Sequence, residues 1–181
     1  IYGLYKYIEP QLPDVATLRD VRLQIPMQVY SADGELIAQY GEKRRIPLTL
    51  DQIPPVMVKA FIATEDSRFY EHHGVDPVGI FRAASVALFS GHASQGASTI
   101  TQQLAKNMFH NRAHNFVQRI MQKAKEYVIA VMLERRYTKD EIIAMYFNTF
   151  DFVNNAVGIE SAARIYFNKK PKDLSTEESA V

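Results

Sequence analysis

The chain has 181 residues, of which 47% are hydrophobic and 23% are charged, and it contains no cysteine. This composition is ordinary for one globular domain with a sizeable core, and it excludes structural disulfides and thiolate metal sites. The net charge is only +1, but residues 100–136 carry seven Lys or Arg and two Glu. A basic segment in which no pattern of interleaved aromatic residues for base stacking is evident favours one site for an anionic ligand over a nucleic-acid surface.

Both ends of the sequence indicate a piece of a longer protein. No run of about 18 apolar residues occurs, so the chain as given is not expected to span a membrane. We expect residues 1–26 to be a linker that follows a transmembrane anchor outside the given chain, because it begins with apolar and aromatic residues. A capping-box pattern at residues 175–178 predicts a helix that would continue past Val181. Residues 27–181 are therefore expected to form one domain that is truncated at its C-terminal end.

The first predicted elements are a β-hairpin over residues 27–40 and a helix that follows it. Apolar and aromatic residues stand on both sides of Asp33-Gly34, a pair typical of a tight hairpin turn. The helix is expected to begin near Asp51, with prolines in its first turn, and to continue to Glu65.

A dense group of ionisable residues begins where this helix ends. Residues 65–74 contain three acids, one Arg and two His. Glu65 shares a helical face with Phe61 and other apolar residues, and it lies at the C-terminal end, where the macrodipole disfavours a negative charge. Both conditions disfavour the ionised form, as a general base or acid requires. The alternative is a surface acid at a helix end, paired with Arg68 or His72.

Residues 75–89 are almost wholly apolar, with Asp76, Arg82 and Ser85 as the main exceptions. A helix without a polar face is expected either at the centre of the domain or against lipid, and central burial is the default in a domain of this size. Glycine and serine in residues 90–96 indicate a loop.

A second constellation, in residues 96–107, predicts a helix capped by Ser98 or Thr99. The side chains that fall on one side of this helix are polar, with one cation: Thr99, Gln103, Lys106 and Asn107. Helix N-terminal amides together with hydroxyl, amide and ammonium groups suit phosphates and sugar hydroxyls. The alternative is a polar face exposed to solvent.

A long helix is predicted over residues 115–136, where apolar residues recur at helical spacing. Glu126 falls on its core-facing side, and Arg119, Gln122 and Lys123 precede it on the same side. A carboxylate that faces the core beside cations is costly to place, which favours a functional role. The alternative is a buried structural ion pair.

Two further helices complete the predicted architecture. A capping box at residues 138–141 predicts a helix over residues 142–147, and a final helix is expected over residues 158–167 after an Asn-bearing loop at 148–155. The predicted fold class is therefore mainly α, with one short β-hairpin near the N-terminus.

Two carboxylates on different helices, such as Glu65 and Glu126, are typical of enzymes that make or break glycosidic bonds. In such sites one carboxylate acts as a base and the other as an acid or charge stabiliser. The cations predicted beside Glu126 indicate an anionic leaving group or substrate.

Five segments, taken in order, resemble the five signatures of glycosyltransferase family 51, the peptidoglycan polymerases of class A penicillin-binding proteins and their monofunctional relatives. These segments are residues 65–74, 96–107, 122–126, 139–148 and 158–169. The resemblance covers residues 27–181 and implies a lysozyme-like helical lobe with a smaller membrane-facing lobe, which would contact the bilayer through residues 75–89. Gln122 stands where the family usually has Arg, and we hypothesise that Arg119, one turn earlier, compensates for that charge.

The resemblance implies polymerisation of lipid II into β-1,4 glycan chains with inversion and release of undecaprenyl pyrophosphate. Glu65 would be the general base for the acceptor's 4-hydroxyl. Glu126 would assist the departing pyrophosphate, directly or through a divalent cation (Mg or Mn); no other cofactor and no metal-binding residue is assigned. The further residues that the resemblance implies in substrate binding are Asp66, Arg68, Phe69, His72, Ser98, Thr99, Gln103, Lys106, Asn107, Arg119, Lys123 and Asn148.

The resemblance also implies a place at the cytoplasmic (inner) membrane, with the catalytic domain on the extracytoplasmic side. The expected partners are lipid II, the growing glycan strand, the bilayer and phosphoglycolipid inhibitors, and nucleic acid is not expected. Two alternatives remain. A lysozyme-type glycan-cleaving enzyme would have no use for Lys106 and Lys123 in its cleft, and a non-catalytic scaffold for lipid-linked precursors would not depend on Glu65.

Overall fold

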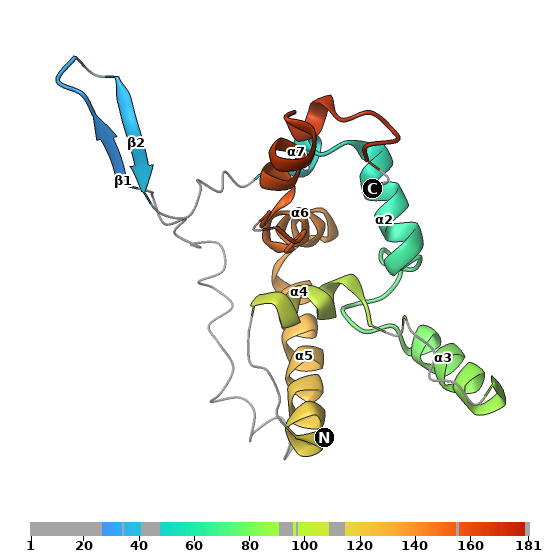
Figure 1. Cartoon of the computed structure of the whole chain (residues 1–181). Helices are drawn as coiled ribbons and strands as arrows, with labels where there is room; N and C mark the ends of the chain where they lie inside the picture. The colour runs from blue at the N-terminus through green and yellow to red at the C-terminus, as the bar shows by residue number, and fades with distance from the viewer. Residues whose placement is uncertain are drawn as a thin grey trace.

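The computed structural model describes a two-stranded hairpin followed by a body of helices (Figure 1). The residues that it describes are 27–33, 35–40, 48–90, 96, 98–108, 115–154 and 156–179. The linker expected over residues 1–26 lies outside these ranges. The mainly α fold with one N-terminal hairpin that the sequence predicted is confirmed.

The hairpin pairs β1 (Met27–Tyr30) with β2 (Leu36–Tyr40) in antiparallel fashion. Its connection is longer than the tight turn that the sequence predicted. The backbone amide of Ser31 donates to the carbonyl of Glu35 at 2.8 Å, the Ser31 hydroxyl accepts from the Glu35 amide at 2.9 Å, and the register shifts between Val29 and Tyr30. The hydrogen bond that the Ser31 side chain accepts thus competes with the predicted tight turn at Asp33-Gly34.

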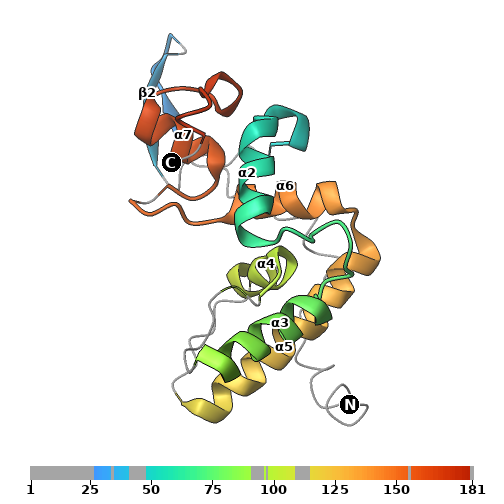
Figure 2. The ribbon, with the colours of Figure 1, turned by 90° about the vertical axis from the view of Figure 1, so that its right-hand side faces the viewer.

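The helices of the body are α2 (Pro55–Glu65), α3 (Pro77–Ser90), α4 (Ile100–Met108), α5 (Phe116–Arg136), α6 (Lys139–Thr149) and α7 (Ile159–Phe167). Short 3-10 helices, η3 (Leu50–Gln52) and η4 (Pro171–Asp173), lie before α2 and after α7. The short helix α4 packs on both α5 and α6 (Figure 2).

The helix that ends at Glu65 begins later than expected. Asp51 lies in η3, whose Thr49 and Gln52 form a capping box of their own, and α2 starts only at Pro55. The two segments do not join because prolines 54 and 55 have no amide hydrogen to donate to a preceding turn.

The starts of three other helices follow side-chain caps that are visible in the sequence. The carboxamide of Asn115 accepts a backbone amide at the start of α5, Thr138 and Glu141 form a capping box at α6, and the hydroxyl of Thr99 accepts the amide of Gln102 at the start of α4. Each cap contributes about 1 kcal/mol to its helix. The helix after Thr138 extends beyond the predicted 142–147 at both ends.

The hydrophobic core lies between α4, α5 and α6. The largest side chains buried there are Leu104, Leu133, Ile142, Ile143, Tyr146 and Phe147. Phe61 of α2 packs against this core, with its ring centre 4.8 Å from that of Tyr146 and 5.2 Å from that of Phe147. This contact holds α2 across α6, with its C-terminal end next to α4.

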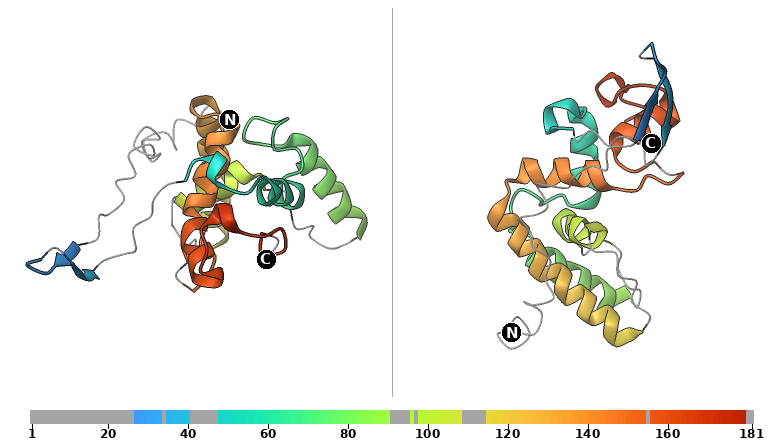
Figure 3. Two further views of the ribbon diagram at one scale, coloured as in Figure 1. Left: turned by 90° about the horizontal axis from the view of Figure 1, so that it is seen from above. Right: turned by 90° about the vertical axis from the view of Figure 1, so that its left-hand side faces the viewer.

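The apolar helix α3 does not lie at the centre of the core. Phe81, Leu88 and Phe89 are 77%, 81% and 88% exposed, and α3 projects from the helical body (Figures 1 and 3). Central burial, the default expectation from its composition, is therefore wrong. Within the described ranges, no helix is both long and apolar enough to cross a bilayer.

The loop after α2 passes close to the backbone of α5 at Gly74. This residue has φ of +86°, and a Cβ there would lie 2.8 Å from the carbonyl carbon and oxygen of Ala130. The carbonyl of Gly74 also accepts from the hydroxyl of Thr99 at 2.7 Å. The missing side chain thus lets the loop lie between α4 and α5.

We expect Gly74→Ala to lower the free energy of unfolding by about 2–4 kcal/mol, because it adds a backbone clash to the strain of a positive φ. Gly96→Ala is the matched control, since Gly96 also has a positive φ (+104°) but no atom within 4 Å of the added Cβ. The control should lower the free energy of unfolding by only about 1 kcal/mol. Urea denaturation of both variants measures the difference, and equal losses would contradict the close approach.

Candidate functional site

Glu65 is the last residue of α2, and its carboxylate is held by α4. The Nε2 atom of Gln103 donates to its Oε2 atom at 2.9 Å, and the Oε1 atom of Gln103 accepts from the hydroxyl of Tyr146 at 3.1 Å. Burial, and next the charge of Glu65, raise the pKa of Tyr146 above its usual range. The side chain of Glu65 is itself exposed. The expectation that it projects from the apolar face of the helix, away from solvent, is therefore wrong, because the last turn of α2 extends past the core that holds Phe61.

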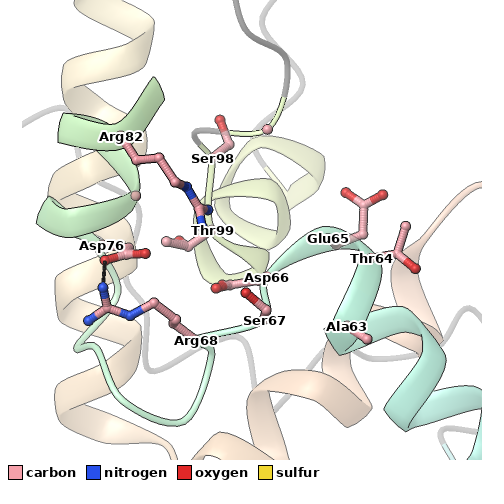
Figure 4. Close-up of a pocket in the computed structure, with 12 residues that line it drawn as sticks. Ala63, Thr64, Glu65, Asp66, Ser67, Arg68, Asp76, Arg82, Ser98 and Thr99 are labelled. Carbon is pink, nitrogen blue, oxygen red and sulfur yellow. Dashed lines mark ion pairs between the residues drawn. The ribbon is translucent and has the colours of Figure 1, made fainter. Parts of the chain in front are cut away.

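A pocket of about 240 Å³, the Glu65 pocket, opens beside this carboxylate (Figure 4). Its charged and hydroxyl-bearing lining residues are Thr64, Glu65, Asp66, Ser67, Arg68, Asp76, Arg82, Ser98 and Thr99. The Nη1 atom of Arg68 lies 3.7 Å from the Oδ1 atom of Asp76. This Oδ1 atom also accepts the backbone amide of Val78 at 3.1 Å at the start of α3. Arg82 reaches from α3 into the pocket. Charges of both signs therefore line it.

Asp66 joins the end of α2 to the start of α4. Its buried carboxylate accepts the backbone amide of Ile100 at 3.0 Å and lies 2.9 Å from Nε2 of His72. His72 is buried as well, and it is not among the residues that line either pocket. Asp66 and His72 thus act on the site by fixing α4 beside Glu65, and Asp66 also forms part of the pocket wall.

A second pocket of about 470 Å³, the Glu126 pocket, shares Ser98 with the first. Its lining residues are Ser98, Gln102, Gln103, Lys106, Asn107, Arg119, Gln122, Lys123, Glu126 and Phe150. Three cationic side chains therefore converge on one concave surface that has a single carboxylate. Such an arrangement suits a phosphate-bearing ligand.

Glu126 is only 6% exposed and is paired with Lys123. The ammonium group of Lys123 lies 2.8 Å from Oε2 of Glu126 and donates to the hydroxyl of Ser98 at 2.9 Å. Gln122 donates to Oε1 of Glu126 at 3.4 Å. The ion pair that the sequence left open as an alternative is thus present, and it forms part of a pocket wall.

The two glutamates lie in neighbouring pockets. Ser98 lines both pockets, and Gln103 lines the Glu126 pocket while its amide binds Glu65. The structure thus places eleven of the predicted residues in the lining of these two pockets: Glu65, Asp66, Arg68, Ser98, Thr99, Gln103, Lys106, Asn107, Arg119, Lys123 and Glu126.

Besides His72, two predicted residues line neither pocket. Phe69 is fully buried, and the ammonium group of Lys139 lies 4.4 Å from its ring centre. The carboxamide of Asn148 accepts the amide of Leu48 at 2.9 Å and donates to its carbonyl at 2.8 Å. Both residues hold segments of the body together, so their assignment to substrate binding stays a prediction without geometric support.

The described residues contain no group of three or more His, Asp or Glu side chains that could hold a metal ion. At Glu126 the ammonium of Lys123 already takes one carboxylate oxygen. This donor set does not fit a divalent cation, which prefers several oxygen ligands.

Among the residues of the site that the sequence did not indicate are Arg82 and Tyr146. Arg82 interrupts an otherwise apolar helix, and a lone charge of this kind was the available signal. Tyr146 lies among apolar residues at helical spacing, so its sequence pattern predicts only a core residue. Its hydroxyl reaches Gln103 because α6 packs on α4, which no local pattern shows.

Comparisons with known proteins identify the family of the chain. The family model described as transglycosylase matches residues 33–181. The chain is 70% identical over its whole length to penicillin-binding protein 1A of Escherichia coli strain K12, covering 21% of that protein. It is 54% identical over its whole length to penicillin-binding protein 1A of Vibrio cholerae, covering 22%. It is 45% identical over 99% of its length to penicillin-binding protein 1A of Pseudomonas aeruginosa, covering 21%.

The chain thus spans about a fifth of the length of these relatives. The family match covers most of the chain and contains both pockets. Together with the five motifs, it shows that the chain belongs to the transglycosylase family, glycosyltransferase family 51.

Proposed function

We propose that this chain is a peptidoglycan glycosyltransferase domain that polymerises lipid II into β-1,4 glycan strands. The observation that carries the proposal is the juxtaposition of two features. The carboxylate of Glu65 is held by Gln103 at the opening of one pocket, and the neighbouring pocket presents Lys106, Arg119 and Lys123. A base next to a cationic site matches glycosyl transfer from a sugar diphosphate.

In the proposed step, Glu65 takes the proton of the acceptor's 4-hydroxyl while that oxygen bonds to the anomeric carbon of the donor. The bond from this carbon to the diphosphate oxygen breaks, and its electron pair leaves with undecaprenyl pyrophosphate. Attack from the face opposite the leaving group inverts the anomeric centre. The exposure of Glu65 supports this role, because an acceptor hydroxyl must reach its carboxylate.

The Glu126 pocket would hold the departing diphosphate, whose charge grows as the bond breaks. Lys106, Arg119 and Lys123 supply the positive charge. A carboxylate alone would repel this leaving group, so we infer that Glu126 assists through Lys123, whose ammonium it holds beside Ser98. Phosphoglycolipid inhibitors would occupy the same cationic surface.

The two rival functions have less support. A hydrolase of uncharged glycan gains nothing from three cations around one pocket. A scaffold that only binds lipid-linked precursor does not need the oriented carboxylate of Glu65. Incubation with labelled lipid II separates the three functions, because only a transferase yields polymer.

We further propose that the domain works at the extracytoplasmic face of the inner membrane and contacts the bilayer through α3. The support is the row of exposed apolar side chains on α3, which includes Phe81, Leu88 and Phe89. Apolar groups of this size gain free energy when they leave water for lipid. The lipid-linked substrate could then reach Arg82 and the Glu65 pocket from the membrane surface.

For catalysis, we expect Glu65→Gln in the full-length protein to lower the rate of polymerisation from labelled lipid II more than about 100-fold, because it removes the general base. Glu160→Gln is the control, since Glu160 pairs with Arg164 on α7 outside both pockets. The control should polymerise at the wild-type rate. Polymerisation at that rate by Glu65→Gln would contradict the assigned role.

For the diphosphate site, we expect Arg119→Ala to lower turnover about 10–100-fold, the usual value of a hydrogen bond to a charged group. If Arg119 supplies the charge that Gln122 lacks, adding Gln122→Arg to this variant should restore most of the rate. Arg164→Ala on α7 is the control for loss of an arginine. An unchanged rate for Arg119→Ala would contradict the hypothesis that Arg119 replaces the charge missing at Gln122.

For membrane contact, we expect the triple change of Phe81, Leu88 and Phe89 to Ser to weaken binding to lipid vesicles at least about tenfold. Val153→Ser with Ile165→Ser is the control, because these apolar side chains are also exposed but lie outside α3. Vesicle flotation of the isolated domain measures the effect. Equal binding by both variants would argue against α3 as the contact.

A further inference from the structure

Three side chains from three helices form a chain of hydrogen bonds that ends at Glu65. Tyr146 of α6 donates its hydroxyl hydrogen to Oε1 of Gln103 at 3.1 Å. Gln103 of α4 then donates from Nε2 to Oε2 of Glu65 at 2.9 Å. The first member is buried in the core, at 1% exposure, whereas the last is exposed at the end of α2.

The middle member of this chain needs to be oriented. The two ends of a glutamine amide have similar shapes, but one end accepts hydrogen bonds and the other donates them. A reversed Gln103 amide would turn its oxygen towards the carboxylate of Glu65 and repel it. A donor on the far side of the amide excludes this orientation, and the hydroxyl of Tyr146 is such a donor.

The Tyr146 hydroxyl is well suited to this task because its ring is buried and packed between other aromatic rings. The ring centre lies 4.8 Å from that of Phe61 and 5.1 Å from that of Phe150. Burial and the nearby charge of Glu65 raise the pKa of Tyr146, so its hydroxyl keeps its proton at neutral pH. A phenylalanine would fill the same space in the core, but it has no hydroxyl to donate to the Gln103 oxygen and would not orient the amide.

We propose that Tyr146 is a positioning residue for glycosyl transfer: its hydroxyl fixes the Gln103 amide, which in turn holds the carboxylate of Glu65 at the opening of its pocket. This inference rests on the proposed function, in which Glu65 is the base. It gives a core tyrosine a part in catalysis without contact to either substrate.

The first test is Tyr146→Phe in the full-length protein. We expect turnover with lipid II to fall about tenfold, the value of one lost hydrogen bond at an oriented group, while KM changes less than about twofold because no residue that lines either pocket is replaced. Tyr70→Phe is the matched control. It also removes a tyrosine hydroxyl, which lies 3.4 Å from Asp140 outside both pockets, and it should leave both constants unchanged.

A double-mutant cycle tests whether the effect passes through Gln103. In a Gln103→Ala background, adding Tyr146→Phe should lower turnover less than about twofold, because the intermediate link is already absent. A further tenfold loss in that background would overturn the proposal, since Tyr146 would then act by another route. Full turnover of the single Tyr146→Phe variant would overturn it as well.

A readout without substrate separates this inference from the proposed function. In NMR spectra of the isotope-labelled protein, the side-chain NH₂ signals of Gln103 should differ from those of exposed glutamines. The Gln103 signals should move towards the positions of the exposed glutamine signals in Tyr146→Phe but not in Tyr70→Phe. Unchanged Gln103 signals in Tyr146→Phe would overturn the positioning role. A wild-type protein that makes no polymer would instead refute the proposed function.

Discussion

The site depends on one buried carboxylate, that of Asp66. It follows Glu65 directly in the sequence, and it accepts the backbone amide of Ile100 and contacts His72. Free amides at a helix start carry partial positive charge, so a carboxylate there is favourable. The same group buried without partners would be strongly destabilising. This bond fixes the end of α2 on the start of α4 and thereby brings Glu65 within reach of Gln103.

The short helix α4 then serves two pockets at once. Ser98, two residues before its first residue, lines both of them. Gln103 binds the carboxylate on one side, and Lys106 adds to the cationic surface on the other. The carboxylate of Glu65 and the cationic surface therefore share one helix, which packs on α5 and α6. A shift of α4 would disturb both parts of the proposed reaction together.

The distribution of polarity in the body fits a substrate with an apolar and a polar part. The pockets are lined mainly by charged, hydroxyl-bearing and amide side chains, while α3 exposes aromatic and aliphatic groups to solvent. Arg82 connects the two regions, since it starts on α3 and lines the Glu65 pocket. A lipid-linked sugar diphosphate would meet both environments, as the proposed function requires.

The sequence by itself determined the features that depend on neighbours a few residues apart. The capping box at Thr138 sets the start of α6, and five ordered motifs identify the family and the candidate glutamates. Tertiary structure decided what each face touches: the exposure of α3 and of Glu65, the burial of Phe69 and the bond from Tyr146 to Gln103. Helix caps and the periodicity of apolar residues depend on residues a few positions apart. The burial of a helix face depends on helices that are far away in the chain.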